Sequence, residues 1–122
     1  MAENEKLVIM ATYGPQDPER ATIPFVMGCA ALASEVDVVL GLQVDGVRLA
    51  RKGEVDGVCA PEFPPLAGLV DTYRELGGKI LVCSPCMKSR DIQPEDLIEG
   101  TEIVAAARFV AEITSATNSL VY

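Results

Sequence analysis

Histidine and tryptophan are absent from this chain of 122 residues, and three Phe and three Tyr are its only aromatic residues. The absence of histidine excludes the nucleophile–histidine pairs on which many hydrolases depend. A zinc site would need all four cysteines, which show no second paired spacing, so we expect no metal and no cofactor. Long apolar runs are also missing, because charges or glycine interrupt each one well short of a bilayer span, and we expect no membrane association.

Positive charge is scarce. Ten Lys and Arg stand against eighteen Asp and Glu, which gives a formal charge of −8. An acidic chain without a cluster of basic residues binds nucleic acids and anionic membranes poorly, so we expect neither as a partner. Residues 1–6 are acidic and lead directly into a predicted strand, which indicates no signal peptide and a cytoplasmic location.

Short apolar bursts alternate with helical patterns along the chain. Strands are predicted at residues 6–12, 36–42, 79–83, 102–105 and 119–121. Helices are predicted from between residues 18 and 24 to about 34, at 66–76, just after 83, and at 106–116, with a helical first turn at 94–98. This alternation predicts a single α/β domain over residues 1–122, with three α/β/α layers around a mostly parallel five-stranded sheet.

In such folds ligands gather at the carboxyl ends of the strands. Residues 12–17, 43–45 and 83–90 follow the first three strands and should share that edge. Thr12, Tyr13 and Gly14 are therefore expected to line a site. One glycine is too few for a phosphate-binding loop, and Tyr13 is equally compatible with packing of the loop.

Two cysteines, Cys83 and Cys86, give the strongest chemical signal. Cys83 ends a predicted strand, and Ser84 is predicted to cap a helix that places Cys86 in its first turn. Free N–H groups and the dipole of a helix favour a thiolate there, and Lys88 and Arg90 add positive charge. We therefore expect Cys83 and Cys86 to be reactive, with Ser84, Lys88 and Arg90 stabilising the anion. The alternative is a buried strand-end cysteine beside an incidental one, with solvated basic residues.

The other candidates have simpler explanations. Cys29 lies on the apolar face of a predicted helix and is expected to be a small core residue. For Cys59, in a proline-rich segment, a structural role and a place near Cys83 both stay open, and we favour the structural role. Glu95 and Asp96 suit the first turn of a helix better than a pair of catalytic carboxylates.

Four features lie in places that suggest a known family: the loop 12–21, the turn 63–66, Cys83 with Arg90 seven positions later, and the closing segment 106–122. Together they resemble the DsrE/DsrF-like family, which has the YchN-like fold, and specifically its small stand-alone members often labelled predicted peroxiredoxins. The resemblance implies sulfur relay, with Cys83 carrying sulfane sulfur as a persulfide. The chain departs from the relay pattern in its second thiol, Cys86, and in Asp91, where relay members often have glycine.

From these features we expect a sulfane-sulfur carrier or transfer protein, with Cys86 as a resolving or modulating thiol and sulfur donor and acceptor proteins as partners. Whether the chain is an enzyme stays open between sulfurtransferase-like and thiol-redox activity. One alternative is a dithiol oxidoreductase, and another is a non-catalytic oligomeric binding module. A strict peroxidase is disfavoured, because neither Thr nor Ser stands three residues before Cys83.

Self-association is expected as well. Residues 25–33 contain no charge and residues 105–111 only that of Arg108, so these helices are apolar around most of their circumference. One sheet buries only one stripe of each helix, and the excess should face another subunit. The family resemblance implies a homotrimer or a homohexamer.

Overall fold

The computed structural model describes residues 4–122. The strands are β1 (Lys6–Ala11), β2 (Asp37–Leu42), β3 (Lys79–Cys83), β4 (Thr101–Val104) and β5 (Asn118–Val121). The α-helices are α1 (Pro18–Ala33), α2 (Leu66–Glu75), α3 (Ser84–Lys88) and α4 (Ala106–Thr114), and the 3₁₀-helices are η1 (Val44–Ala50) and η2 (Pro94–Asp96). Within the described part of the chain, no helix has the length and apolar content needed to cross a membrane.

The five strands form one sheet in the order β4-β3-β2-β1-β5, and every neighbouring pair is parallel. The sequence predicted a mostly parallel sheet, and the sheet is parallel throughout because each connection crosses over one face before the next strand begins. In the centre, Val8 lies beside Val39 of β2 and Ser119 of β5.

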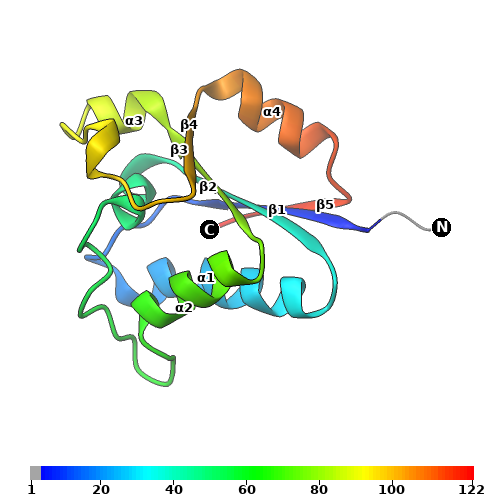
Figure 1. Ribbon diagram of the computed structural model, residues 1–122, viewed down its shortest axis with the longest axis horizontal. Coiled ribbons are helices and arrows are strands. Elements are labelled where there is room, and N and C mark those ends of the chain that lie inside the picture. Colours follow the sequence, from blue (N-terminus) through cyan, green and yellow to red (C-terminus); the bar gives the residue numbers. More distant parts are fainter. Residues whose placement is uncertain (1–3) are drawn as a thin grey trace.

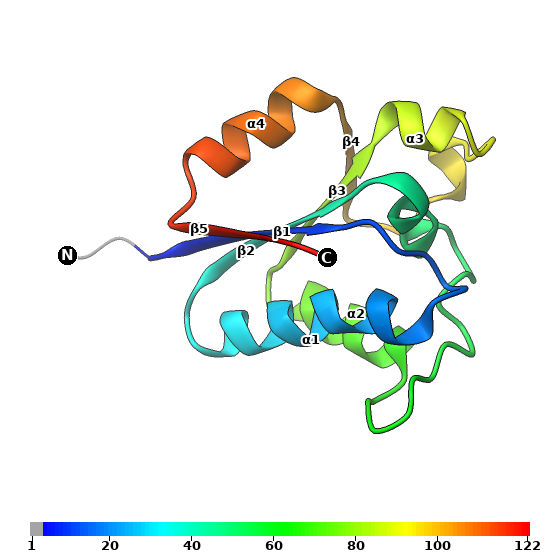
Figure 2. The same cartoon turned by 180° about the vertical axis from the view of Figure 1, so that it is seen from behind.

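Helices cover both faces of the sheet, which confirms the predicted three layers. Figure 1 shows α1 and α2 on one face and α3 and α4 on the other, and Figure 2 shows the same arrangement from behind. Residues 38–42 of β2 are all buried, as their unbroken apolar pattern predicted for a strand covered on both sides.

Tyr73 of α2 joins the helices of one face to the sheet. Its ring packs edge-on against Phe25 of α1, with the ring centroids 5.6 Å apart, and its hydroxyl donates to the Lys79 carbonyl at 2.7 Å. A side chain at Gly78 would meet the Tyr73 ring at 2.3 Å, so only glycine fits beside it. Gly77, with φ +91°, ends α2 where the sequence predicted a helix end.

The structure fixes the start of α1, which the sequence left between residues 18 and 24. The helix begins at Pro18, where Asp17 accepts from the Arg20 N–H at 3.3 Å, and Pro24 lies inside the helix. The half-buried Cys29 of α1 packs against the core, with its Sγ 3.6 Å from the Leu69 carbonyl of α2. Burial raises the pKa of Cys29, as the expected core role implies.

Candidate functional site

The loops that follow β1, β2 and β3 meet at the carboxyl edge of the sheet, as the topology predicted. The Asp45 carboxylate accepts from the Gln16 side chain of the first loop and from Arg90 Nε of the third, the latter at 2.8 Å. The backbone N–H of Val44 donates to Cys86 Sγ at 3.2 Å. These contacts bring the two cysteines and the loop after β2 into one site.

The two thiols of the site differ in exposure. Cys83 ends β3 and is only 8% exposed, whereas Cys86 of α3 is half-buried. Burial raises the pKa of Cys83, and a hydrogen bond with the Cys86 side chain adds to the rise. At neutral pH Cys83 is therefore a protonated thiol shielded from solvent, with a second thiol in contact.

The expected helix cap at Ser84 is wrong. The helix α3 begins at Ser84 itself, Cys83 occupies the capping position, and no side chain caps the helix. The helix is only five residues long, so its dipole contributes little to the site. The sequence pattern misplaced the cap because Cys83 is both the last strand residue and the residue before the helix.

Arg90 has a different role from the expected one. Its Nε forms an ion pair with Asp45, and its Nη1 donates to the Cys86 carbonyl at 3.2 Å and to Ser89 Oγ at 3.1 Å. The hydrogen bond from Arg90 and the second one from Gln16 hold the pKa of Asp45 below its ordinary value. The guanidinium is thus engaged by a carboxylate, and its charge has only a minor lowering effect on the pKa of Cys83.

Lys88 is exposed and, among the residues that the structure describes, forms no ion pair. It lines a cavity of about 190 Å³. The other lining residues are Ser84, Met87, Ile92, Gln93, Pro94 and Ile103. The wall is mainly apolar, and the cavity provides a small pocket next to the residue that follows Cys83.

The predicted lining loop contributes only in part. Gly14 lies against the site, since a side chain there would meet the Asp45 carbonyl at 2.8 Å. Thr12 instead donates its hydroxyl to the Tyr122 carbonyl at 2.7 Å, which fixes the C-terminal residue. The Tyr13 ring lies under the Arg20 guanidinium, 5.1 Å from its centroid. Both side chains are therefore engaged in packing the loop.

Cys59 is exposed in the segment that leads into α2. That segment lies on the side of the sheet covered by α1 and α2, whereas α3 lies on the opposite side (Figure 1). This placement argues against a position near Cys83, and a structural role for the exposed Cys59 stays a prediction. Asp96 accepts from the Gln93 N–H at 2.8 Å, which agrees with the helical first turn expected for Glu95 and Asp96.

The sequence placed residues 43–45 at this edge but did not single out Val44 or Asp45 as residues of the site. Val44 has a left-handed backbone conformation with φ +54°, which a β-branched residue rarely adopts. No property of a valine indicates this conformation in advance. The only available signal was the Asp45-Gly46 pair, a common turn sequence, directly after a buried strand.

The model of the DsrE/DsrF-like family matches residues 5–122. The chain belongs to this family. Sulfur relay is the activity for which the family is known. The predicted fold and family are thereby confirmed, and the family match covers both thiols, the β2 loop and Arg90.

Three relatives are uncharacterized proteins, and the matches cover different shares of their length. The chain is similar to the uncharacterized protein MJ0760 of Methanocaldococcus jannaschii, with 38% identity over 87% of this chain and 38% of that protein. It therefore spans little more than a third of that relative. The uncharacterized proteins MJ0989 of the same organism and MK0008 of Methanopyrus kandleri are 29% and 28% identical. Those matches cover 96% and 95% of this chain and 99% and 93% of the relatives.

Two solved structures share the fold. The ychN protein from E. coli superposes with a TM-score of 0.82 at 22% identity, over 97% of this chain and 99% of that one. The protein of unknown function MTH1491 from Methanobacterium thermoautotrophicum superposes with a TM-score of 0.69 at 16% identity, over 96% and 99%. At these identities the likeness establishes the fold alone.

Proposed function

We propose that the chain carries sulfane sulfur at the Cys83–Cys86 pair, holds it as a persulfide on Cys83, and passes it to the thiol of an acceptor protein. The observation that carries the proposal is the contact between two thiols of unequal exposure at the functional edge of the sheet. Family membership supports the same chemistry.

Burial of Cys83 suits storage of sulfur. A persulfide is reversible and is lost when a thiol or an oxidant reaches it, so a shielded sulfur prolongs its lifetime. For release, an acceptor thiolate attacks the outer sulfur of Cys83–S–SH, the S–S bond of the persulfide breaks, and Cys83 leaves as a thiolate. One S–S bond replaces another, so the transfer needs no oxidant or reductant.

The same contact favours one second candidate, a dithiol oxidoreductase. In that reaction Cys83 and Cys86 join in a disulfide, and a disulfide substrate is reduced to two thiols. The two functions change the mass of the protein differently. A carrier gains one sulfur atom, whereas an oxidised dithiol loses two hydrogen atoms.

Mass spectrometry of the intact protein after incubation with glutathione persulfide tests the proposal. We expect a gain of one sulfur atom that persists after the reagent is removed and maps to Cys83 by fragmentation. The Cys83→Ser variant should lose the persistent adduct, and the matched Cys59→Ser variant should keep it. A disulfide between Cys83 and Cys86 would favour the oxidoreductase, and no adduct in the wild type would contradict the carrier.

A further inference from the structure

We propose that Cys86 is the thiol that first accepts sulfur, and that the Val44 N–H, held in place by the Arg90–Asp45 ion pair, stabilises its anion. This inference rests on the proposed carrier function and assigns an order to its two thiols. In it, Cys86 receives sulfur from outside and Cys83 stores it. Val44, Asp45 and Arg90 are positioning residues.

The backbone at Val44 is strained in a way that its side chain does not explain. The left-handed φ of +54° costs a β-branched residue free energy that the surroundings must offset. The Val44 side chain is 50% exposed, so burial in the core does not hold it there. This backbone conformation points the Val44 N–H toward Cys86, and it donates to the Cys86 Sγ at 3.2 Å.

The neighbours of Val44 fix this direction from both sides. Before it, the Gln43 N–H donates to the Ala11 carbonyl of β1 at 3.1 Å. After it, the Asp45 carboxylate is bound by Arg90, and a side chain at Gly46 would lie 2.1 Å from the Ala11 carbonyl. The loop after β2 is thus attached to the end of β1 and to the segment after α3.

Arg90 joins the two partners of the Val44–Cys86 contact. One nitrogen of its guanidinium binds the Asp45 carboxylate, and another donates to the carbonyl of Cys86 itself. A planar guanidinium can make both contacts at once, whereas the single ammonium of a lysine serves them poorly. The ion pair therefore sets the distance between the Val44 N–H and the Cys86 sulfur.

Charges around Cys86 come from each element that packs against α3. Asp45 and Arg48 lie on η1, Cys83 ends β3, and Lys88 and Arg90 belong to α3 and the segment after it. A hydrogen bond from an amide favours the anionic form of the sulfur that accepts it. A carboxylate near a thiol acts in the opposite direction through space. Asp45 thus favours the Cys86 anion by positioning the Val44 N–H and disfavours it through the charge of its carboxylate. Because the two effects have opposite signs, a substitution of Asp45 can distinguish them.

Sulfur entry then proceeds in two exchanges. The Cys86 thiolate attacks the outer sulfur of a small persulfide R–S–SH, the donor S–S bond breaks, and the donor leaves as its thiol after taking a proton. The Cys83 sulfur, as its proton leaves to solvent, attacks the same outer sulfur, and Cys86 departs as a thiolate. A stabilised anion is the better leaving group, and a thiol of raised pKa is the stronger nucleophile once ionised, so transfer favours Cys83.

The experiment measures the rate of alkylation of Cys86 by iodoacetamide across pH in wild type, Asp45→Asn and Arg90→Lys. Cys83 and Cys86 share one tryptic peptide, between Lys79 and Lys88, so fragmentation assigns the label. In both variants we expect the rate at neutral pH to fall by roughly five- to ten-fold, because the amide contact loosens. Lys88→Gln is the control and should change the rate less than two-fold, roughly. Thermal unfolding of each variant verifies that it is folded.

An equal or faster rate in Asp45→Asn would overturn the positioning role, since removal of a carboxylate alone accelerates alkylation. Equal slowing in Lys88→Gln would overturn it as well, in favour of plain charge. The order of entry is read from rapidly quenched wild type with glutathione persulfide, in which the adduct on Cys86 should precede that on Cys83. The reverse order overturns the entry role. A wild type that takes no sulfur contradicts the carrier function, while the alkylation result still decides the role of Val44.

Discussion

At the scale of single residues, burial distinguishes four thiols that are chemically identical in the sequence. Cys59 is exposed, Cys29 and Cys86 are half-buried, and Cys83 is buried. Burial raises the pKa of Cys83 above its ordinary value of 9.0. The protonated Cys83 thiol therefore contributes to the stability of the fold below pH 9, and this contribution is lost as pH rises through the raised value. Burial and the raised pKa of Cys83 therefore both slow its reaction with reagents in solution.

The alkylation rates of the thiols test this difference. In the folded protein we expect iodoacetamide to modify Cys83 at least roughly ten-fold more slowly than Cys59 at neutral pH, because fewer Cys83 sulfurs are ionised and fewer are accessible. Peptide mapping over time measures both rates. In urea-unfolded protein the two rates should become similar, and a similar rate in the folded protein would contradict the burial described for Cys83.

Gly46 provides a second test at this scale. A methyl group in Gly46→Ala would lie 2.1 Å from the Ala11 carbonyl, so the loop after β2 must move away from β1. We expect a loss of about 1–3 kcal/mol in the free energy of unfolding and slower alkylation of Cys86. Gly68 of α2 is the matched control, because a methyl group there meets nothing within 4 Å. Gly68→Ala should stabilise the protein by about 0.5–1 kcal/mol, as measured by urea unfolding.

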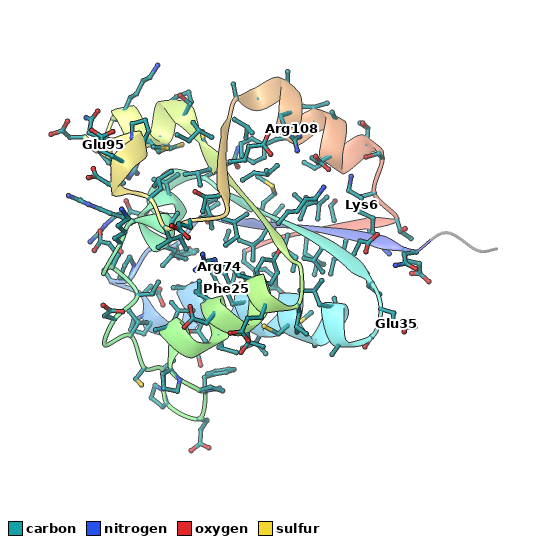
Figure 3. All side chains as sticks on the ribbon, viewed as in Figure 1. Lys6, Phe25, Glu35, Arg74, Glu95 and Arg108 are labelled. Carbon is teal, nitrogen blue, oxygen red and sulfur yellow. The ribbon has the colours of Figure 1, made fainter. Side chains whose placement is uncertain are left out.

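At the scale of elements, both charges and apolar packing attach α4 to the sheet. Phe109 is its buried residue and packs over Gly41 of β2. The Glu112 carboxylate accepts from Lys6 Nζ of β1 at 2.6 Å and from Arg108 Nε at 2.7 Å. Figure 3 shows Lys6 and Arg108 on the same side of the sheet as α4. Arg108 also forms an ion pair with Glu102 of β4. Apolar packing of Phe109 and ion pairs of Arg108 and Glu112 thus fasten α4 to the sheet.

Stability in acid should report on this attachment. Hydrogen bonds from Lys6 and Arg108 lower the pKa of Glu112 below its ordinary value of 4.5. A lowered pKa stabilises the fold above that value, and the stabilisation is lost as pH falls through the lowered value. We expect Glu112→Gln to cost about 0.5–1 kcal/mol at pH 7 and to flatten the loss of stability as the pH falls below the ordinary glutamate value of 4.5. The exposed Glu75→Gln is the control in the same urea titrations and should do neither.

At the scale of the whole molecule, α4 and the strands at the two edges of the sheet carry apolar side chains on the surface. Val110 is 58% exposed, and Ile113 of α4, Ile103 of β4 and Val121 of β5 are exposed as well. Large apolar side chains left exposed in this way are typical of a contact with another subunit. The expectation of a homotrimer or homohexamer stays a prediction.

Light scattering at micromolar concentration tests it. We expect a mass that is a multiple of the 13.0 kDa chain, and we expect Val110→Glu to shift it to smaller species, because a carboxylate would be buried at the contact. Leu76→Glu is the control, since Leu76 is 48% exposed at the end of α2, away from α4. A stable species of 13.0 kDa in the wild type would contradict self-association.

The order of elements and the edge that carries the site could be predicted from the sequence by itself. Apolar periodicity, Gly77 and the prolines are local signals, and they placed β3 at its observed limits and every other strand end within one residue. The run from Cys83 to Arg90 likewise identified the thiol pair before any contact was known. The parallel sheet follows, because crossover connections admit few other arrangements.

Only the tertiary structure decided what the residues at that edge do. The Val44–Cys86 contact joins residues 42 positions apart, and the Arg90–Asp45 ion pair joins residues 45 apart. No local pattern encodes such distances. The sequence therefore predicted Arg90 as a positive charge near the thiols, whereas in the structure Arg90 forms an ion pair with Asp45. It also predicted Ser84 as a helix cap, whereas no side chain caps α3. Local preferences set where strands and helices begin and end. The environment and burial of each thiol depend instead on loops that meet only once the strands have assembled into the sheet.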